Sequence, residues 1–165
     1  MKRIPIAIAG AGVIALAALV GLASGSSNGY LTRTAGATKV KVTLAPRGDQ
    51  SKLESSTSVA RAGEVTFIVH NASDLAHGST YGVPNTPEAH ELVVLRTNAA
   101  PDKLRVDSTW GTAIETGRVG EPLAVDPGKT RTITLNLKPG KYVLICNFPG
   151  QYEAGQRVAF RVVSS

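Results

Sequence analysis

The sequence predicts an all-β protein, an antiparallel β-sandwich or barrel of six or seven short strands. Two observations predict this class. Apolar and polar residues alternate within several short segments, and glycine and proline separate those segments. No segment beyond residue 30 shows the longer apolar period of an amphipathic helix. A chain of 165 residues has room for one such domain with its own core.

The N-terminal residues differ in composition from the rest of the chain. Lys2 and Arg3 precede a long uncharged apolar run, and Ala23 and Gly25 are small residues suited to cleavage of a signal peptide. The run also approaches the ~20 residues that a membrane helix needs. We therefore expect a signal peptide or a retained membrane anchor. Either one places the domain outside the cytoplasm, in the periplasm, in the cell envelope or secreted.

The predicted organisation has three parts. Residues 1–25 are the signal peptide or anchor, residues 26–37 form a flexible linker, and residues 38–165 form the domain. Without Lys2 and Arg3 the formal net charge falls from +6 to +4. The remaining basic residues are scattered along the predicted strands, which is typical of solvated strand faces. No nucleic-acid-binding motif is present, so nucleic acid is not an expected partner.

Six segments carry the two-residue period of a half-buried strand. In chain order they are KVKVTL (39–44), EVTFIV (64–69), HELVVL (90–95), TITLNL (132–137), KYVLIC (141–146) and VAFRV (158–162). Pro139 and Gly140 supply a tight turn between the fourth and fifth. The connections 71–89 and 99–129 are too long for simple turns. The second contains Trp110, and we expect it to hold a short helix or a flap over one end of the sandwich.

One histidine and the single cysteine occupy strand ends that face the predicted core. They are His90 and Cys146, 56 residues apart, and a sandwich can bring such positions together between its sheets. A neutral imidazole beside a thiolate is half of a soft metal site. The alternative is that the cysteine is an inert buried apolar residue and the histidine is only hydrogen-bonded.

Residues 146–156, CNFPGQYEAGQ, resemble the copper-binding loop of the cupredoxins, or blue copper proteins. In that family a C-x4-H-x4-M loop joins a histidine from a distant strand. Four further segments are similar to the family's strands and to the connection in its plastocyanin-like and sulfocyanin-like members: AGEVTFIVHN (62–71), EAHELVVL (88–95), LRVDSTWGTAIETGRVGE (104–121) and DPGKTRTITLNLKPGKYVLIC (126–146). The resemblance extends over residues 40–163. It implies a cupredoxin-like Greek-key β-sandwich of about seven strands, a copper cofactor and one-electron transfer to a redox protein partner.

The resemblance also implies a ligand set. His90 matches the distant histidine and Cys146 the thiolate, while Gln151 stands at the loop-histidine position and Gln156 at the axial methionine position. Glutamine is a known axial alternative, but a carboxamide is a harder and weaker equatorial donor than imidazole. Gln151 is thus a doubtful ligand. His77, in the loop before His90, is a possible substitute; the alternative is a solvated loop histidine.

Three functions are consistent with these residues. The first is an exported copper-binding electron carrier with an altered site, and not an enzyme. The second is a redox-silent cupredoxin-like module of the cell envelope that has lost copper. In a third reading Cys146 is a nucleophile and His90 its base, but no motif marks an oxyanion hole. The sequence predicts no oligomeric state.

Overall fold

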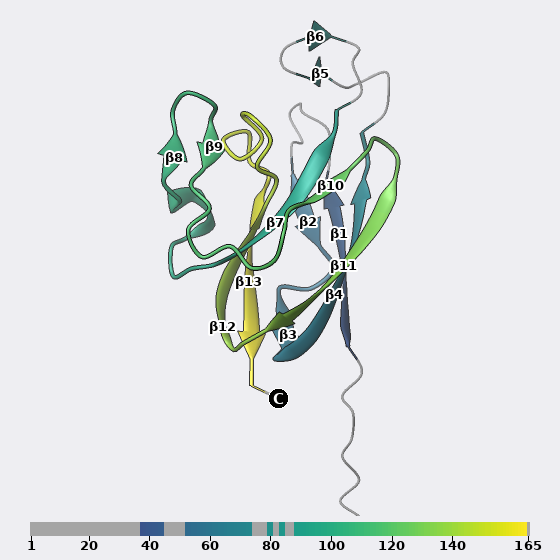
Figure 1. The fold of residues 1–165 in the computed structure, drawn as a ribbon, viewed down its shortest axis with the longest axis vertical. Helices are drawn as coiled ribbons and strands as arrows, with labels where there is room; N and C mark the ends of the chain where they lie inside the picture. Colours follow the sequence, from purple (N-terminus) through teal and green to yellow (C-terminus); the bar gives the residue numbers. More distant parts are fainter. Residues whose placement is uncertain (1–36, 45–51, 74–78, 81–82, 85–87, 165) are drawn as a thin grey trace, which may run out of the picture. The chain divides into compact units, whose positions relative to one another are not determined.

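The structure is a computed structural model that describes residues 37–44, 52–73, 79–80, 83–84 and 88–164 (Figure 1). All of them belong to one compact unit, Ala35–Ser165. The predicted signal peptide or anchor and nearly all of the predicted linker lie outside the described residues. Within the described part of the chain, no helix is long and apolar enough to cross a membrane.

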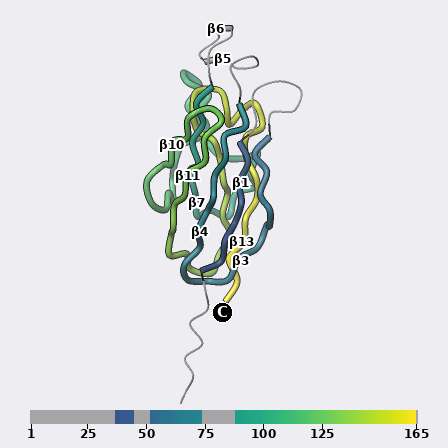
Figure 2. Tube along the Cα trace, turned by 90° about the vertical axis from the view of Figure 1, so that its right-hand side faces the viewer, coloured from purple at the N-terminus to yellow at the C-terminus, as the bar shows by residue number. Residues whose placement is uncertain are grey.

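Two β-sheets form the domain, and their strands run along nearly the same direction in Figures 1 and 2. In spatial order, the four-stranded sheet contains β11 (Thr130–Leu137), β4 (Gly63–Asn71), β1 (Thr38–Leu44) and β2 (Leu53–Ser55). The five-stranded sheet contains β10 (Leu123–Val125), β7 (His90–Arg96), β12 (Gly140–Ile145), β13 (Arg157–Val163) and β3 (Val59–Arg61). This arrangement confirms the predicted all-β sandwich.

Three short elements lie in the long connections. They are the β5–β6 hairpin (Ser79–Thr80 and Val83–Pro84), the single 3-10 turn η1 (Pro101–Lys103) and the β8–β9 pair (Val106–Asp107 and Thr112–Ala113). All six predicted strands are present. The additional strands β2, β3 and β10 have three residues each, which is too short for an alternating pattern to show in the sequence.

Most neighbouring strands are antiparallel, as predicted, but two pairs are parallel. β1 pairs with β4, and β13 pairs with β3. Parallel neighbours need a crossover connection. For β1 and β4 this crossover passes through the other sheet. After β2 the chain crosses to the five-stranded sheet and forms β3, and it then returns to the four-stranded sheet as β4, beside β1. The sequence pattern shows which faces are buried but not the direction of the neighbouring strand.

The main core lies between the two sheets and is formed by the apolar members of the alternating segments. In β4, for example, Val65, Phe67 and Val69 are fully buried while their neighbours are exposed or half-buried. Phe67 meets Phe160 of β13 edge to face, with 5.6 Å between ring centroids. In this arrangement the positive edge of one ring faces the negative face of the other, which is electrostatically favourable. The pair joins the four-stranded sheet to the five-stranded one.

A second apolar cluster lies on the other face of the five-stranded sheet. It contains Val93, Leu95, Val143, Ile145, Ala113 and Tyr152. β7 and β12 are therefore buried on both faces at these positions. Leu104 and Val106 of the connection after β7 pack against this cluster. The predicted short helix is present as η1, but the connection covers a sheet face instead of only capping one end of the sandwich.

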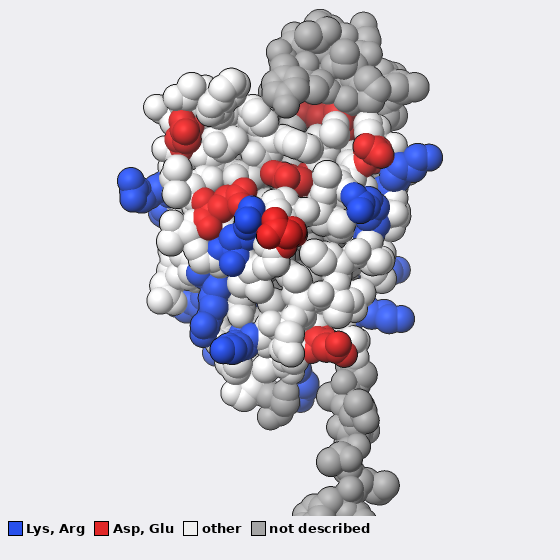
Figure 3. All heavy atoms as spheres, in the orientation of Figure 1, with Lys and Arg blue, Asp and Glu red and all other residues white. Residues whose placement is uncertain are grey.

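Acidic and basic side chains are interspersed on the face shown in Figure 3. Arg118 forms ion pairs with Glu115 at 3.0 Å and with Glu121 at 3.4 Å. Exposed pairs of this kind contribute little to stability. The charge distribution on this face agrees with the scattered pattern expected from the sequence.

Replacement of Phe67 by alanine should destabilise the protein by about 3–5 kcal/mol, because it removes a fully buried ring and leaves a cavity beside Phe160. Urea-induced unfolding measures the change. Val59→Ala is the matched control, since Val59 is 44% exposed, and it should change stability by less than about 0.5 kcal/mol. Equal effects of the two substitutions would contradict the assignment of the core.

Candidate metal centre

The fold brings His90 and Cys146 together inside the sandwich. β7 begins at His90, and Cys146 directly follows β12, its antiparallel neighbour. The Nδ1 atom of His90 lies 3.4 Å from the Sγ atom of Cys146, and both side chains are 0% exposed. The predicted proximity is confirmed. Their role as metal ligands remains a prediction.

Hydrogen bonds fix the orientation of the imidazole. The Ser73 hydroxyl lies 2.9 Å from Nε2 of His90, and Ser73 is itself held by a bond from its N–H to the Oδ1 atom of Asn71. We assign the proton to Nε2, because this tautomer lets Nε2–H donate to the hydroxyl and leaves the Nδ1 lone pair facing the sulfur. A metal-binding imidazole commonly has a partner on its other nitrogen in this way.

The sulfur of Cys146 is held in a neutral form in the metal-free protein. Burial raises the pKa of the thiol to about 12, while the N–H groups of Glu91 and Phe148 act in the opposite direction. The Glu91 N–H lies 3.3 Å from Sγ and donates to it. The S–H group in turn can donate to Nδ1 of His90. Nδ1 of His90 and Sγ of Cys146 therefore share one proton, and a bound metal ion would replace that proton.

The loop after Cys146 turns both predicted glutamines into the interior. Gly150 and Gly155 have φ values of 73° and 108°, which favour glycine, and each directly precedes a glutamine. Gln151 is 2% exposed and Gln156 0%. The N–H of Cys146 donates to the carbonyl of Gln156 at 3.0 Å, and the N–H of Gln156 donates to the carbonyl of Gln151 at 3.1 Å. The loop is thus closed on itself by its own backbone.

Several buried polar residues of this cluster were missed by the sequence analysis, and one of them, Glu88, contacts Gln151. Glu88 is 2% exposed, and its Oε1 atom accepts a hydrogen bond from Nε2 of Gln151. Its Oε2 atom lies 4.0 Å from Nε2 of His90. The two-residue period of the strand offered a signal, because it places position 88 on the same face as position 90. A carboxylate is seldom buried without a partner, so the pattern alone favoured an exposed residue.

The carbonyl end of Gln151 is the feature that points to a ligand. Its Oε1 atom is buried and accepts no hydrogen bond from the residues that the structure describes. A buried carbonyl oxygen without a donor costs about 1–3 kcal/mol. A bound cation would remove this cost. The thiol, the imidazole and this oxygen are therefore compatible with a mixed soft and hard metal site.

The other two histidines of the chain, His70 and His77, are not part of the described cluster. His77 lies outside the described residues, so its role as a substitute ligand stays a prediction. His70 is exposed on β4, and its Nδ1 atom lies 3.1 Å from the hydroxyl of Thr130. No group of three or more histidine, cysteine, aspartate or glutamate side chains suited to a metal ion occurs in the described ranges.

The loop is also tied to the connection that covers the outer face of the sheet. The side chain of Asn147 accepts from the N–H of Ala113 at 2.7 Å and donates to its carbonyl at 3.0 Å, as a neighbouring strand would. The N–H of Gly150 donates to the carbonyl of Trp110 at 3.0 Å. The Trp110 side chain is 61% exposed. These contacts fix the loop from outside the core, and the sequence pattern did not predict them.

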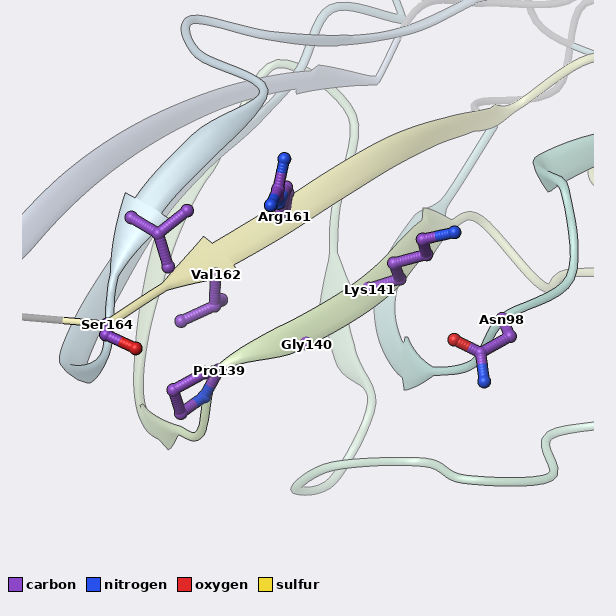
Figure 4. A pocket seen from close by; sticks show the side chains of 8 residues that line it. Asn98, Pro139, Gly140, Lys141, Arg161, Val162 and Ser164 are labelled. Atoms are coloured by element: carbon purple, nitrogen blue, oxygen red, sulfur yellow. The ribbon is translucent and has the colours of Figure 1, made fainter.

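A surface hollow of about 540 Å³ lies along the ends of β12 and β13, away from these side chains (Figure 4). Its lining includes Pro139, Lys141, Arg161 and Ser164, and Lys141 pairs with Arg161 across the two strands. Two further hollows formed by described residues share Asn98 and Lys141 with it and extend over neighbouring parts of the same sheet and its connections. None of the three reaches the thiol of Cys146.

The metal-free protein should react slowly with iodoacetamide at pH 8, at least about 100-fold more slowly than the urea-unfolded chain. Cys146 is fully buried, and a pKa raised from 9.0 to about 12 reduces the reactive thiolate. The chain has a single cysteine, so mass spectrometry reports this site alone. The raised pKa also means that the neutral thiol stabilises the fold below pH 9, and that this contribution is lost as the pH rises towards 12. Equal alkylation of folded and unfolded protein would contradict the burial.

No protein-family model and no curated protein matches the chain. Solved structures do match it. A variant of the copper protein rusticyanin is 14% identical over 76% of this chain and 78% of its own, with a TM-score of 0.52. A reduced auracyanin from the photosynthetic bacterium Roseiflexus castenholzii is 21% identical over 78% of this chain and 99% of its own, with a TM-score of 0.48. A multi-copper oxidase from Pediococcus acidilactici is 13% identical over 79% of this chain and 27% of its own, with a TM-score of 0.49. The protein has the fold of the cupredoxins, the blue copper proteins.

Proposed function

We propose that the protein is an exported copper-binding protein that carries single electrons and has an altered blue-copper site. One observation carries the proposal. The Nδ1 atom of His90 and the Sγ atom of Cys146 lie 3.4 Å apart in a fully buried position. The cupredoxin fold and the buried, unsatisfied oxygen of Gln151 support it further.

The proposed donor set has two strong and two weak members. His90 would supply imidazole Nδ1, and Cys146 would supply a thiolate. Gln156 would supply its carboxamide as a weak donor, and Gln151 would supply Oε1 where an imidazole is usual in the family. His77 is the alternative to Gln151 for the third strong position. Copper held by these residues would supply a one-electron couple.

The protein's own groups prepare the site for such a role. Ser73 holds the Nε2 proton of His90, and the N–H of Glu91 stabilises negative charge on the sulfur. Burial keeps water away from both donors. Because the loop is closed by its own backbone and held by Asn147, the donors can keep their positions in two oxidation states. A fixed site lowers the rearrangement that electron transfer requires.

The competing function is a redox-silent module of the cell envelope that keeps the fold without the metal. It is consistent with the two glutamines, Gln151 and Gln156, at the loop positions where the resemblance places metal ligands. The nucleophile reading is less well supported, because a fully buried thiol with a pKa raised to about 12 is not an activated nucleophile. We therefore propose a carrier, not an enzyme, with a redox protein as its partner.

We also propose that the domain is located outside the cytoplasm. An exported electron carrier requires that residues 1–25 act as a signal peptide or as an N-terminal anchor. The anchor would attach the domain to a membrane, and cleavage would leave it in the periplasm or secreted. N-terminal sequencing of the protein recovered from cells separates these two outcomes.

Addition of Cu(II) to the metal-free protein should give one bound ion per chain and an intense visible absorption from thiolate-to-copper charge transfer. The reason is that Cys146 and His90 already face each other. Titration monitored by absorption and by metal analysis measures both. Cys146→Ser is the control and should lose the band. Failure of the native protein to take up Cu(II) would favour the redox-silent module.

Replacement of Gln151 by histidine should raise the affinity for copper by at least about 10-fold, because imidazole is a stronger donor to copper than a carboxamide. It should also raise the reduction potential, since a hard oxygen donor favours the oxidised metal. Competition titrations and voltammetry measure the two changes. A native potential at or above that of the Gln151→His protein would contradict coordination through the carboxamide. His77→Ala is the matched variant for the substitute ligand and should lower affinity only if His77 binds the metal.

A further inference from the structure

We propose that Glu88 is a positioning residue that determines which end of the Gln151 carboxamide is available to the metal. By accepting a hydrogen bond from the NH₂ group, Glu88 leaves the carbonyl oxygen as the free donor atom. This inference rests on the proposed function, because it concerns the third donor of the same site. The inference gives a role to the buried carboxylate of Glu88, which is not among the proposed metal ligands.

The first support is the contact itself. Nε2 of Gln151 donates to Oε1 of Glu88, and each of the two residues is 2% exposed. The two ends of a carboxamide differ chemically, because the nitrogen only donates and the oxygen only accepts. A carboxylate beside it favours the orientation with the nitrogen towards the carboxylate. Only the oxygen end can coordinate a metal cation, so this orientation is the productive one.

The second support is the state of the other end of the same side chain. Oε1 of Gln151 is buried and accepts no hydrogen bond from the described residues. A carboxamide free to rotate in a buried site would turn to satisfy both ends if a donor were near. Glu88 therefore holds an orientation in which the oxygen remains available. An unsatisfied buried oxygen in the loop that follows the buried thiol is compatible with a site that awaits a cation.

The third support is that Glu88 is itself held in place. Nδ2 of Asn71 donates to the backbone carbonyl of Glu88 at 2.9 Å and to that of Val125 at 2.8 Å. Asn71 also accepts from Ser73, the residue that holds His90. One buried asparagine thus fixes the partners of both the imidazole and the carboxamide. Carboxylates that support metal-bound imidazoles act through the same kind of outer contact.

A double-mutant cycle on the full chain tests whether Glu88 acts through Gln151. Leucine replaces each residue, alone and together, because it removes the polar groups without adding a ligand. Titration with Cu(II) alone gives the affinities. Glu88→Leu should lower the affinity about 10- to 100-fold in the native background and cause no further loss in the Gln151→Leu background. An equal loss in both backgrounds would show a direct charge effect or direct ligation by Glu88 and would overturn the inference.

The orientation of the carboxamide can be measured without metal. In nuclear magnetic resonance spectra of the metal-free protein, the side-chain NH₂ signals of Gln151 should be protected from solvent exchange. Glu88→Gln keeps an acceptor oxygen and should preserve this protection, whereas Glu88→Leu should abolish it while thermal unfolding remains cooperative. Unchanged NH₂ signals in Glu88→Leu would overturn the inference.

The two measurements separate the inference from the function on which it rests. If the native protein binds no Cu(II), the proposed function fails, and the metal-free spectra still decide whether Glu88 orients Gln151. If Cu(II) binds but the cycle shows equal losses, the function stands and the positioning role fails. Coupling in the cycle together with loss of NH₂ protection in Glu88→Leu supports both.

Discussion

The antiparallel pairing of β7 with β12 is the constraint on which the site depends. Residues 93–96 of β7 each have a fixed partner on β12, as in the pair Val93 and Ile145. Because of this register, His90, the first residue of β7, lies close to Cys146, the residue that follows β12. His90 and Cys146 therefore meet although 56 residues separate them. A slip of one residue would turn either side chain to the opposite face of the sheet, so the same pairing that buries the core also assembles the donors.

Burial of polar groups at this end of the sandwich requires compensation, because a buried polar group without a partner costs about as much as a lost hydrogen bond or more. Most of the buried groups have partners within the cluster. Asn71 bonds to Ser73 and to two backbone carbonyls, Ser73 bonds to His90, and the sulfur accepts from the Glu91 N–H. The oxygen of Gln151 accepts no hydrogen bond from the described residues. A nearly satisfied network in which a loop carbonyl oxygen is still without a donor is compatible with a bound cation.

The sheet that carries the site is covered on both faces. Between the sheets lies the main core, and outside lies the smaller cluster with Tyr152 and Ala113. Tyr152 belongs to the loop after Cys146, and its hydroxyl bonds to Pro101 and Leu104 of the connection after β7. The loop is thus fixed from both sides. This explains how a segment with two left-handed glycines can hold its side chains in defined positions.

The sequence by itself determined the positions and buried faces of the six longer strands, because strand alternation is a local property that the side chains report directly. It also indicated the all-β class. The family resemblance of the loop indicated the pair His90 and Cys146. The tertiary structure alone decided the parallel pairings of β1 with β4 and of β13 with β3, the second cluster on the outer face, and the burial of Glu88 beside Gln151. These features depend on which distant segments become neighbours. Glu88 is the clearest case, since a carboxylate is normally exposed and its contact with an amide from a loop 63 residues away helps to make its burial favourable.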